Sequence, residues 1–280
     1  MIRIITDSAA DLGIIENTKE LTVVPLHINI DGVEYTDGID INPDTFYDKI
    51  KKSKGFPKTS QPTPKLFYDA LKDGVEAGDE ILVITISSAL SGTISSATMA
   101  KEMHGYDKIT IYDSLQATGG EHILVDEALK QVKLHKSVKE IIEILENVRK
   151  RIVYLTLIDD LTYLLKGGRL SKSEAILGNL THIKPMMEIG LDGTISVFHK
   201  AMGKPRAYRY LVKRFKNLEI DNNYPLYTTY TDSSKNLDIL MKKLSEYTKN
   251  SKIVQGRFGS TIGTHVGATG LGIFYVKKEN

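Results

Sequence analysis

Residues 80–103 read EILVITISSALSGTISSATMAKEM, and this stretch indicates the fold class. The apolar run at residues 80–86 is typical of a strand buried on both faces, as in a parallel sheet. A turn rich in serine follows, and residues 92–103 then carry apolar side chains at helical spacing. A strand that turns directly into a helix is the start of a βαβ unit, so we predict parallel strands connected by helices.

The rest of the first half repeats this alternation. Apolar runs predict three more strands, and amphipathic stretches predict helices between them. The strands are expected at residues 2–6, 108–112 and 153–158, and the helices at 64–73, 121–134 and 138–148. We therefore expect residues 1–160 to form a Rossmann-like α/β domain, a parallel sheet flanked by helices.

Residues 21–36 interrupt the alternation. Apolar and polar residues alternate there around Asp31-Gly32, a dipeptide typical of tight hairpins. We predict strands at residues 22–29 and 33–35, a β-hairpin excursion that reaches toward a neighbouring domain. Residues 48–64 contain many Lys, Ser, Gly and Pro residues and predict a connection that is not helical throughout.

The second half has a different order of elements. Strands are expected at residues 194–199, 226–231, 253–257 and 272–276, with helices at 205–218 and 235–247. This order predicts an α+β domain with a mixed sheet over residues 161–280. The expected fold is thus α/β, with two domains.

Composition excludes several classes of protein. The 37 Lys and Arg residues nearly balance the 35 Asp and Glu residues, so the net charge of +2 gives no reason to expect nucleic-acid binding. No apolar run approaches the roughly 20 residues of a membrane span. The absence of cysteine excludes disulfides, thiolate metal sites and a cysteine nucleophile. The first residues lack a signal-peptide pattern, and we expect a cytoplasmic protein without integral membrane association.

Polar side chains follow three predicted strands of the first half. They are Thr6-Asp7-Ser8, residues 87–93 and Asp113-Ser114. Ligands of open α/β sheets bind beyond the carboxyl ends of the strands. These three turns therefore predict a ligand site at one edge of the sheet.

Ser91 and Gly92 lie where the second of these turns enters a helix. A helix N-terminus offers unpaired N–H groups and positive potential, which suit a carboxylate or a phosphate. Gly92 would let a ligand approach the backbone closely, and Ser91 adds a hydroxyl donor. The alternative is that serine and threonine here only cap the helix, and both interpretations remain open.

The segment Pro57–Pro64 is stiffened by prolines. Thr63 and Pro64 fit the N-cap and first position of the next helix. No such structural role is evident for Thr59, Ser60 and Gln61, so this rigid loop is interpreted as a recognition element.

Two further segments carry cationic or imidazole side chains. Gly167-Gly168 is typical of a helix end, but Arg169 and Lys172 beside it also form a cationic loop that could bind a carboxylate or a phosphate. The spacing is not that of a P-loop. His265 lies among small residues in a glycine-rich segment, residues 256–267, whose glycines predict tight turns. From the residues alone, His265 is equally well explained as a site residue or as a structural one.

Together these segments resemble the DegV family of bacterial fatty-acid-binding proteins. The matching motifs run in order along nearly the whole chain: Thr6-Asp7-Ser8, residues 58–62, residues 87–93, Asp113-Ser114, residues 167–171, Lys184-Pro185 and residues 262–267. One departure is Gly267-Ala268-Thr269-Gly270, where the family pattern has Pro-Gly after the first glycine.

The resemblance implies that a long-chain fatty acid lies between the two domains and that a partner kinase phosphorylates it with ATP. Carried over by motif, Thr59 and Ser91 would bind the carboxylate, and His265 would belong to the same polar network. Ser60 and Gly92 are their neighbours in these motifs. Arg169 would lie near the mouth that faces the kinase. The chain itself would be a carrier that needs no cofactor, not an enzyme.

Physical chemistry is consistent with such a ligand, because a fatty acid needs an apolar tunnel and donors for its carboxylate. Apolar residues of the second half are candidates to line the tunnel: Ile176, Leu177, Ile183, Met186, Met187 and Ile189. The alternative is a stand-alone hydrolase or phosphoryl-transfer enzyme, with Ser91 as nucleophile, His265 as base and the helix N-terminus as oxyanion site.

Overall fold

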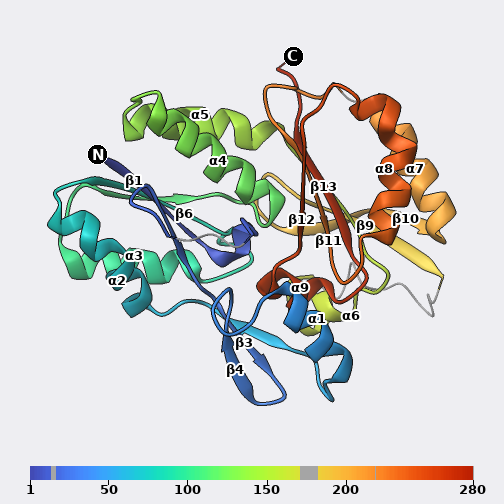
Figure 1. Cartoon of the computed structure of the whole chain (residues 1–280), viewed down its shortest axis with the longest axis horizontal. Helices are drawn as coiled ribbons and strands as arrows, with labels where there is room; N and C mark the ends of the chain where they lie inside the picture. Colours follow the sequence, from blue (N-terminus) through green and yellow to red (C-terminus); the bar gives the residue numbers. More distant parts are fainter. Residues whose placement is uncertain (14–16, 171–181, 218, 280) are drawn as a thin grey trace.

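The computed structural model describes residues 1–13, 17–170, 182–217 and 219–279. A four-stranded sheet and a six-stranded sheet lie side by side, and helices cover and separate them (Figure 1). The expected fold class, a helix-flanked parallel sheet followed by an α+β part with a mixed sheet, is confirmed.

The four-stranded sheet is parallel. Its order is β2 (Leu21–Val24), β1 (Ile2–Asp7), β6 (Glu80–Thr85) and β7 (Ile109–Asp113). Alternate residues of each strand face opposite sides, so Ile5 and Val83 pack under α2 (Pro64–Glu76) and α3 (Thr93–His104). Ile4 and Leu82 face α4 (Gly119–Lys133) and α5 (Val138–Arg151) instead. Both faces are covered by helices, which is why these strands are mainly apolar.

The six-stranded sheet is mixed. Its order is β10 (Ile195–Met202), β9 (Ile183–Ile189), β8 (Ile152–Leu157), β13 (Leu271–Val276), β11 (Leu226–Tyr230) and β12 (Ile253–Arg257). Only β11 and β12 pair in parallel within this order. Helices α7 (Lys204–Lys216) and α8 (Lys235–Thr248) cover its outer face, and α4 contacts its inner face.

Helix α4 therefore lies between the two sheets (Figure 1). A Cβ on Gly119 would lie 2.2 Å from the ring of Phe274 on β13, so glycine at this position lets α4 approach the second sheet closely. One continuous apolar core runs from Ile4 of the first sheet through α4 to Phe274 of the second.

Two predicted elements differ in the structure. The apolar run at 153–158 forms β8, which pairs with β9 and β13 of the mixed sheet and not with the parallel strands. Residues 22–29 are not one strand, because Pro25 divides them and lacks the N–H that a ladder needs. The first part is β2 of the parallel sheet. The division of the chain near residue 160 stays a prediction.

The predicted hairpin at Asp31-Gly32 does form, between β3 (His27–Ile30) and β4 (Val33–Thr36). β5 (Lys58–Ser60) joins β3 as the third strand of this small sheet. Helix α1 (Pro43–Lys52) begins at an Asn42 capping box, before the irregular connection. As predicted, Thr63 and Pro64 start α2, with Thr63 Oγ1 accepting from the N–H of Leu66.

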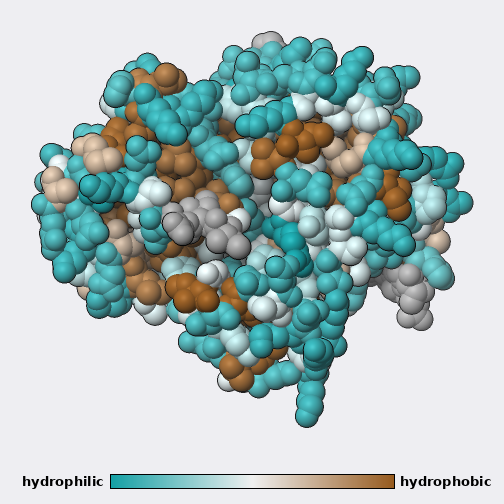
Figure 2. Space-filling model, in the orientation of Figure 1, coloured by the Kyte–Doolittle hydropathy of each residue, from teal (hydrophilic) through white to brown (hydrophobic). Residues whose placement is uncertain are grey.

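None of the helices within the described ranges is long and apolar enough to cross a bilayer. The face seen in Figure 2 is largely hydrophilic, with hydrophobic side chains in separate patches.

Candidate functional site

A cavity lies where the carboxyl ends of β2, β6 and β7 meet the second sheet. Its volume is about 50 Å³. The parallel sheet contributes residues that follow its strands, and the mixed sheet contributes Tyr154, Met187 and Ile195. The short helix α9 (Ser260–Val266) supplies one wall. The cavity thus occupies the strand edge at which the sequence predicts a ligand site.

Four of the predicted site residues line this cavity: Thr59, Ser91, Arg169 and His265. Thr59 is held on β5, where it pairs with Ile28 of β3. Its Oγ1 lies 2.8 Å from Nε2 of His265 on α9. These two residues are 206 positions apart in the sequence, so the tertiary fold builds this polar end of the cavity.

Ser91 contributes a hydroxyl to the polar end of the cavity. It lies just before α3, whose N-terminus has no side-chain cap. Its Oγ lies 2.9 Å from Thr93 Oγ1, and the N-cap residue of α3, Gly92, provides no side-chain cap. The backbone N–H groups of Gly92, Thr93 and Ile94 donate to no atom of the described residues. The interpretation that hydroxyls merely cap this helix is therefore wrong, since the first turn keeps its donors free.

Gly92 has a different role from the one expected. A Cβ at this position would lie 2.0 Å from Oε1 of Gln61, whose Nε2 donates to Ser96 Oγ at 2.9 Å. Gly92 thus admits the Gln61 side chain, which fixes the proline-rich loop to α3. Ser60 is exposed and does not appear among the residues that line the cavity, because neighbours on a strand point to opposite faces.

His265 is largely buried. Burial, together with the nearby charge of Arg169, lowers its pKa to about 3, so the ring is neutral at ordinary pH. Nδ1 has no hydrogen-bond partner within the described part of the chain. A Cβ on Gly167 would lie 2.3 Å from Nδ1, so the glycine at the end of α6 (Thr162–Lys166) makes room for the ring as well as ending the helix.

Arg169 brings a positive charge to the same cavity. Nε donates to the Leu90 carbonyl at 3.0 Å and Nη1 to the Gly167 carbonyl at 2.6 Å. Among the described residues, no carboxylate lies within ion-pair distance of this guanidinium. Burial lowers its pKa from the usual value, but arginine remains charged. The polar end therefore combines hydroxyls, free N–H groups and a cation, which together are complementary to an anion.

The remainder of the cavity is apolar except for Thr261. Its apolar lining consists of ten described residues: Leu26, Ile86, Leu90, Ala117, Tyr154, Leu164, Met187, Ile195, Ile262 and Val266. Met187 is the one tunnel candidate of the sequence among them. Met186 points to the opposite face of β9, into the core under α7 and α8, and Ile183 and Ile189 do not line the cavity. Ile176 and Leu177 lie outside the described residues.

The other two polar turns have structural roles. Asp7 accepts from the N–H groups of Ala9 and Ile86, at 3.0 and 2.9 Å. Asp113 accepts from the N–H groups of Ser88 and Leu115. Of the three turns that the sequence singles out, only the one after β6 supplies a residue of the polar end, Ser91.

Residues 256–267 differ most from their predicted structure. The glycines predict tight turns, yet residues 260–266 form α9. Thr261, Ile262, His265 and Val266 share its cavity face. Their i, i+3 and i+4 spacing was the signal that could have revealed this helix.

The geometry does not assemble a serine nucleophile. His265 Nε2 contacts Thr59, and Ser91 Oγ contacts Thr93, with no hydrogen bond between Ser91 and His265. No described carboxylate accepts from the ring to orient it as a base.

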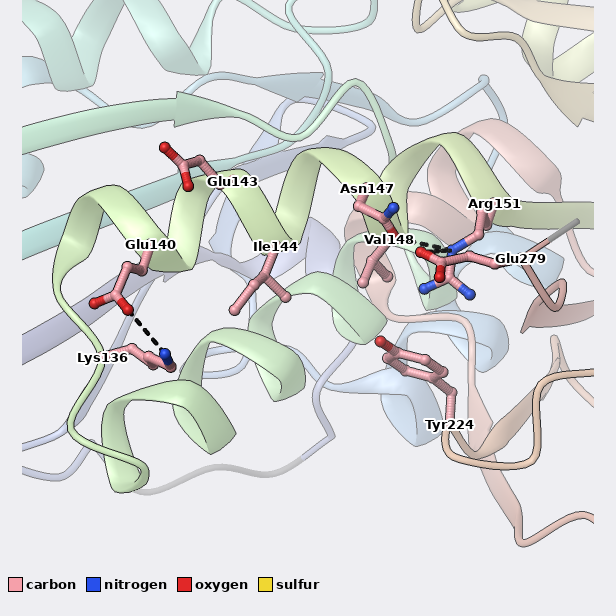
Figure 3. Close-up of a pocket in the computed structure, with 9 residues that line it drawn as sticks. All are labelled: Lys136, Glu140, Glu143, Ile144, Asn147, Val148, Arg151, Tyr224 and Glu279. Atoms are coloured by element: carbon pink, nitrogen blue, oxygen red, sulfur yellow. Dashed lines mark hydrogen bonds and ion pairs between the residues drawn. The ribbon is translucent and has the colours of Figure 1, made fainter.

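Two larger hollows lie elsewhere on the surface. One, of about 470 Å³, lies along α5, where Lys136 pairs with Glu140 and Arg151 with Glu279 (Figure 3). Both cations that line it are thus paired with carboxylates, and Glu143 adds a further acidic group. The other, of about 720 Å³, lies at the amino ends of β1 and β6, opposite to the edge where α/β sheets bind ligands.

Comparison with known proteins gives one consistent result. The sequence model of one protein family, described as an uncharacterised protein of the DegV family, matches residues 1–278. A DegV domain-containing protein of Caldanaerobacter subterraneus is 32% identical over 279 residues, 99% of either chain. The chain belongs to the DegV family.

Solved structures of DegV proteins share the fold. The fatty acid binding DegV family protein of Streptococcus agalactiae superposes with a TM-score of 0.90 at 28% identity, over 100% of this chain and 99% of that one. The Fatty Acid Kinase B3 protein of Streptococcus pneumoniae, whose structure is loaded with linoleic acid, has the same fold, with a TM-score of 0.86 at 22% identity over 99% of each chain.

Proposed function

We propose that this DegV protein binds one long-chain fatty acid, with the carboxylate at the polar end of the cavity and the tail among the apolar residues. The observation that carries the proposal is the convergence of Thr59, Ser91, Arg169 and His265 on one end of a mainly apolar cavity between two sheets. The fatty acid binding of the S. agalactiae relative supports it.

The polar end meets the physical requirement for burying a carboxylate. Such a group must exchange its water for other donors, or its burial is too costly. Thr59 and Ser91 offer hydroxyls, and the first turn of α3 offers N–H groups. Arg169 lies beside them with Nε and Nη1 bonded to backbone carbonyls, so it adds positive potential and is not needed as a ligand of the carboxylate. Hydrogen bonds to a charged group each contribute roughly 1.5–3 kcal/mol. Neutral His265 can accept the Thr59 proton or donate one, which allows Thr59 to adjust to the ligand.

The apolar end supplies most of the affinity. Each buried methylene contributes about 0.8 kcal/mol, so a tail of about 16 carbons needs no further anchor. The cavity of about 50 Å³ is far smaller than the roughly 300 Å³ at the lower end of ligand pockets. We infer that the tail enters by displacing apolar side chains, to which the flexible Met187 is suited.

Presentation to a kinase is the second part of the proposal. A carboxylate oxygen of the bound acid would attack the γ-phosphorus of ATP held by a partner, forming an acyl phosphate and releasing ADP. Arg169 beside the polar end would stabilise the charge of the transferred phosphate. The sequence has no P-loop of its own, so ATP would come with the partner, in the cytoplasm.

Denaturing mass spectrometry of the purified protein tests ligand identity. A stoichiometric fatty acid should be released, and delipidated protein should take up added oleate or palmitate. If no fatty acid is released and neither acid binds, the proposal is wrong. Incubation with ATP and a fatty acid kinase subunit tests presentation separately, since the protein alone should yield no acyl phosphate.

A further inference from the structure

Two aspartates from the first part of the chain reach the start of α9. Asp11 Oδ1 accepts from the backbone N–H of Gly259 at 2.9 Å. Asp37 Oδ2 accepts from Thr261 twice, from its N–H at 3.2 Å and from its hydroxyl at 2.6 Å. Asp37 is buried and Asp11 largely so. Side chains more than 200 positions away in the sequence thus satisfy the first N–H groups of α9.

Gly259 lies where the two aspartates contact the start of α9. It is the N-cap residue of α9 and has no side chain with which to cap the helix. A Cβ there would lie 2.5 Å from Asp11 Oδ1 and 4.0 Å from Asp37 Oδ2. Glycine therefore lets the Asp11 carboxyl approach the helix start, whereas Asp37 lies at ordinary contact distance from position 259.

The helix held in this way carries one wall of the cavity. Thr261 and His265 lie one turn apart on the cavity face of α9, so the contact that fixes Thr261 also sets the position of His265 against Thr59. The other oxygen of Asp11 accepts from Thr118 Oγ1 at 2.6 Å. Thr118 has φ +47°, a strained conformation for a β-branched residue, and it follows Ala117 of the cavity lining.

This arrangement is costly compared with an ordinary helix cap. Among the described residues, neither Asp11 nor Asp37 has an ion-pair partner. Burial raises the pKa of both carboxyls, and repulsion from Asp37 raises the pKa of Asp11 further. A serine or asparagine at position 259 would cap α9 without burying two acids. Proteins keep a destabilising arrangement of this kind where it serves a functional site.

We propose that Asp11 and Asp37 are positioning residues, which hold α9 so that Thr59 and His265 meet the ligand carboxylate and thereby give the cavity its preference for an acid over other head groups. This rests on the proposed function. Neither aspartate lines the cavity. Their effect on the ligand is exerted through Thr261 and His265.

The experiment compares two ligands with the same tail, oleic acid and oleyl alcohol, on delipidated protein. We expect Asp37→Ala to reduce the ratio of the two affinities about ten-fold, by weakening acid binding while alcohol binding stays within about two-fold. Asp37→Asn keeps an acceptor for Thr261 and should retain most of the ratio. Glu121→Gln is the matched control, because Glu121 is a fully buried acid that bonds to Thr6 and not to α9.

Other outcomes overturn the inference. If Asp37→Ala weakens binding of oleic acid and of oleyl alcohol equally, Asp37 has a merely structural role. If neither affinity changes, Asp37 has no role in binding. If Asp37→Ala does not fold, Thr261→Val decides, since it removes only the hydroxyl donor and should lower the ratio about three-fold. If the unmodified protein binds neither ligand, the proposed function itself fails, and the positioning role, which rests on it, fails with it; a change of the ratio confined to the variants concerns the positioning role alone.

Discussion

The two ends of the cavity are built on different principles. The polar end is assembled from β5, the start of α3, the segment after α6 and helix α9, and hydrogen bonds fix its side chains. The apolar end is lined mainly by single side chains of strands, loops and helices that are held by packing alone. Hydrogen bonds require definite positions, whereas packing tolerates exchange of one apolar shape for another. One end is thus suited to recognise a head group, and the other to adapt to a tail.

The largest effect is expected where the polar end meets a partner. Arg169→Ala should reduce acyl-phosphate formation with a fatty acid kinase subunit about 100-fold or more, because the transferred phosphate loses its cation. Binding of the fatty acid itself should persist. Both are measured on one preparation, by phosphate transfer and by bound lipid. If Arg169→Ala empties the protein of lipid, Arg169 belongs to the carboxylate site instead.

Enlarging the apolar end should destabilise the delipidated protein without a matching loss of affinity for the fatty acid. Met187→Ala should lower the free energy of unfolding of the delipidated protein by about 2–5 kcal/mol, because it leaves a hole in the core. Affinity for palmitate should fall much less or rise, since less side chain must be displaced. Met187→Leu is the control for volume. Urea unfolding and ligand titration measure the two effects, and parallel losses would contradict an adaptable tail site.

Removing single hydroxyls should weaken recognition of the head group. Ser91→Ala and Thr59→Ala are each expected to weaken binding of the fatty acid by about 1–3 kcal/mol, the contribution of a hydrogen bond to a charged group. Ser60→Ala provides the matched control, because Ser60 neighbours Thr59 but is exposed and lies outside the cavity lining. Competition with a fluorescent fatty acid gives the affinities. A loss for Ser60→Ala as large as for Thr59→Ala would argue against the polar end.

The smallest effect expected is on the titration of His265. Its pKa is about 3 in the folded protein without ligand and about 6.5 in the unfolded chain, so the unfolded chain binds the extra proton between these values. This group therefore reduces stability as pH falls from about 6.5 toward 3. A bound carboxylate should raise the pKa of His265, whereas oleyl alcohol should not. Ring resonances followed by NMR against pH test this, and equal titration with both ligands would contradict it.

Much of the fold could be predicted, because strand and helix periods appear directly in the sequence. Which sheet a strand joins could not. β8 and β6 are both apolar runs buried on two faces, and only the tertiary partners, β13 and β9 for one and β1 and β7 for the other, distinguish them. Pro25, in contrast, was a visible signal that residues 22–29 are not one strand.

The candidate site likewise has features that the sequence predicts and features that only tertiary contacts determine. Thr59, Ser91, Arg169 and His265 were singled out by motifs, and the cavity brings all four together. The roles of Gly92 and Gly167 depend on which side chain approaches them, Gln61 for one and His265 for the other. The contacts of Asp11 and Asp37 with α9 span more than 200 residues, and no local pattern announces them.

Carbon-13 NMR of palmitate labelled at its carboxyl carbon tests the central claim most directly. Bound to the delipidated protein, the label should give one resonance at one equivalent and remain ionised well below the ordinary carboxyl pKa of about 4, because the hydroxyls of Thr59 and Ser91 and the free N–H groups of α3 favour the anion. Ser91→Ala and Thr59→Ala should shift that resonance. A label that titrates like free palmitate, or one indifferent to both substitutions, would contradict a carboxylate held at this end of the cavity.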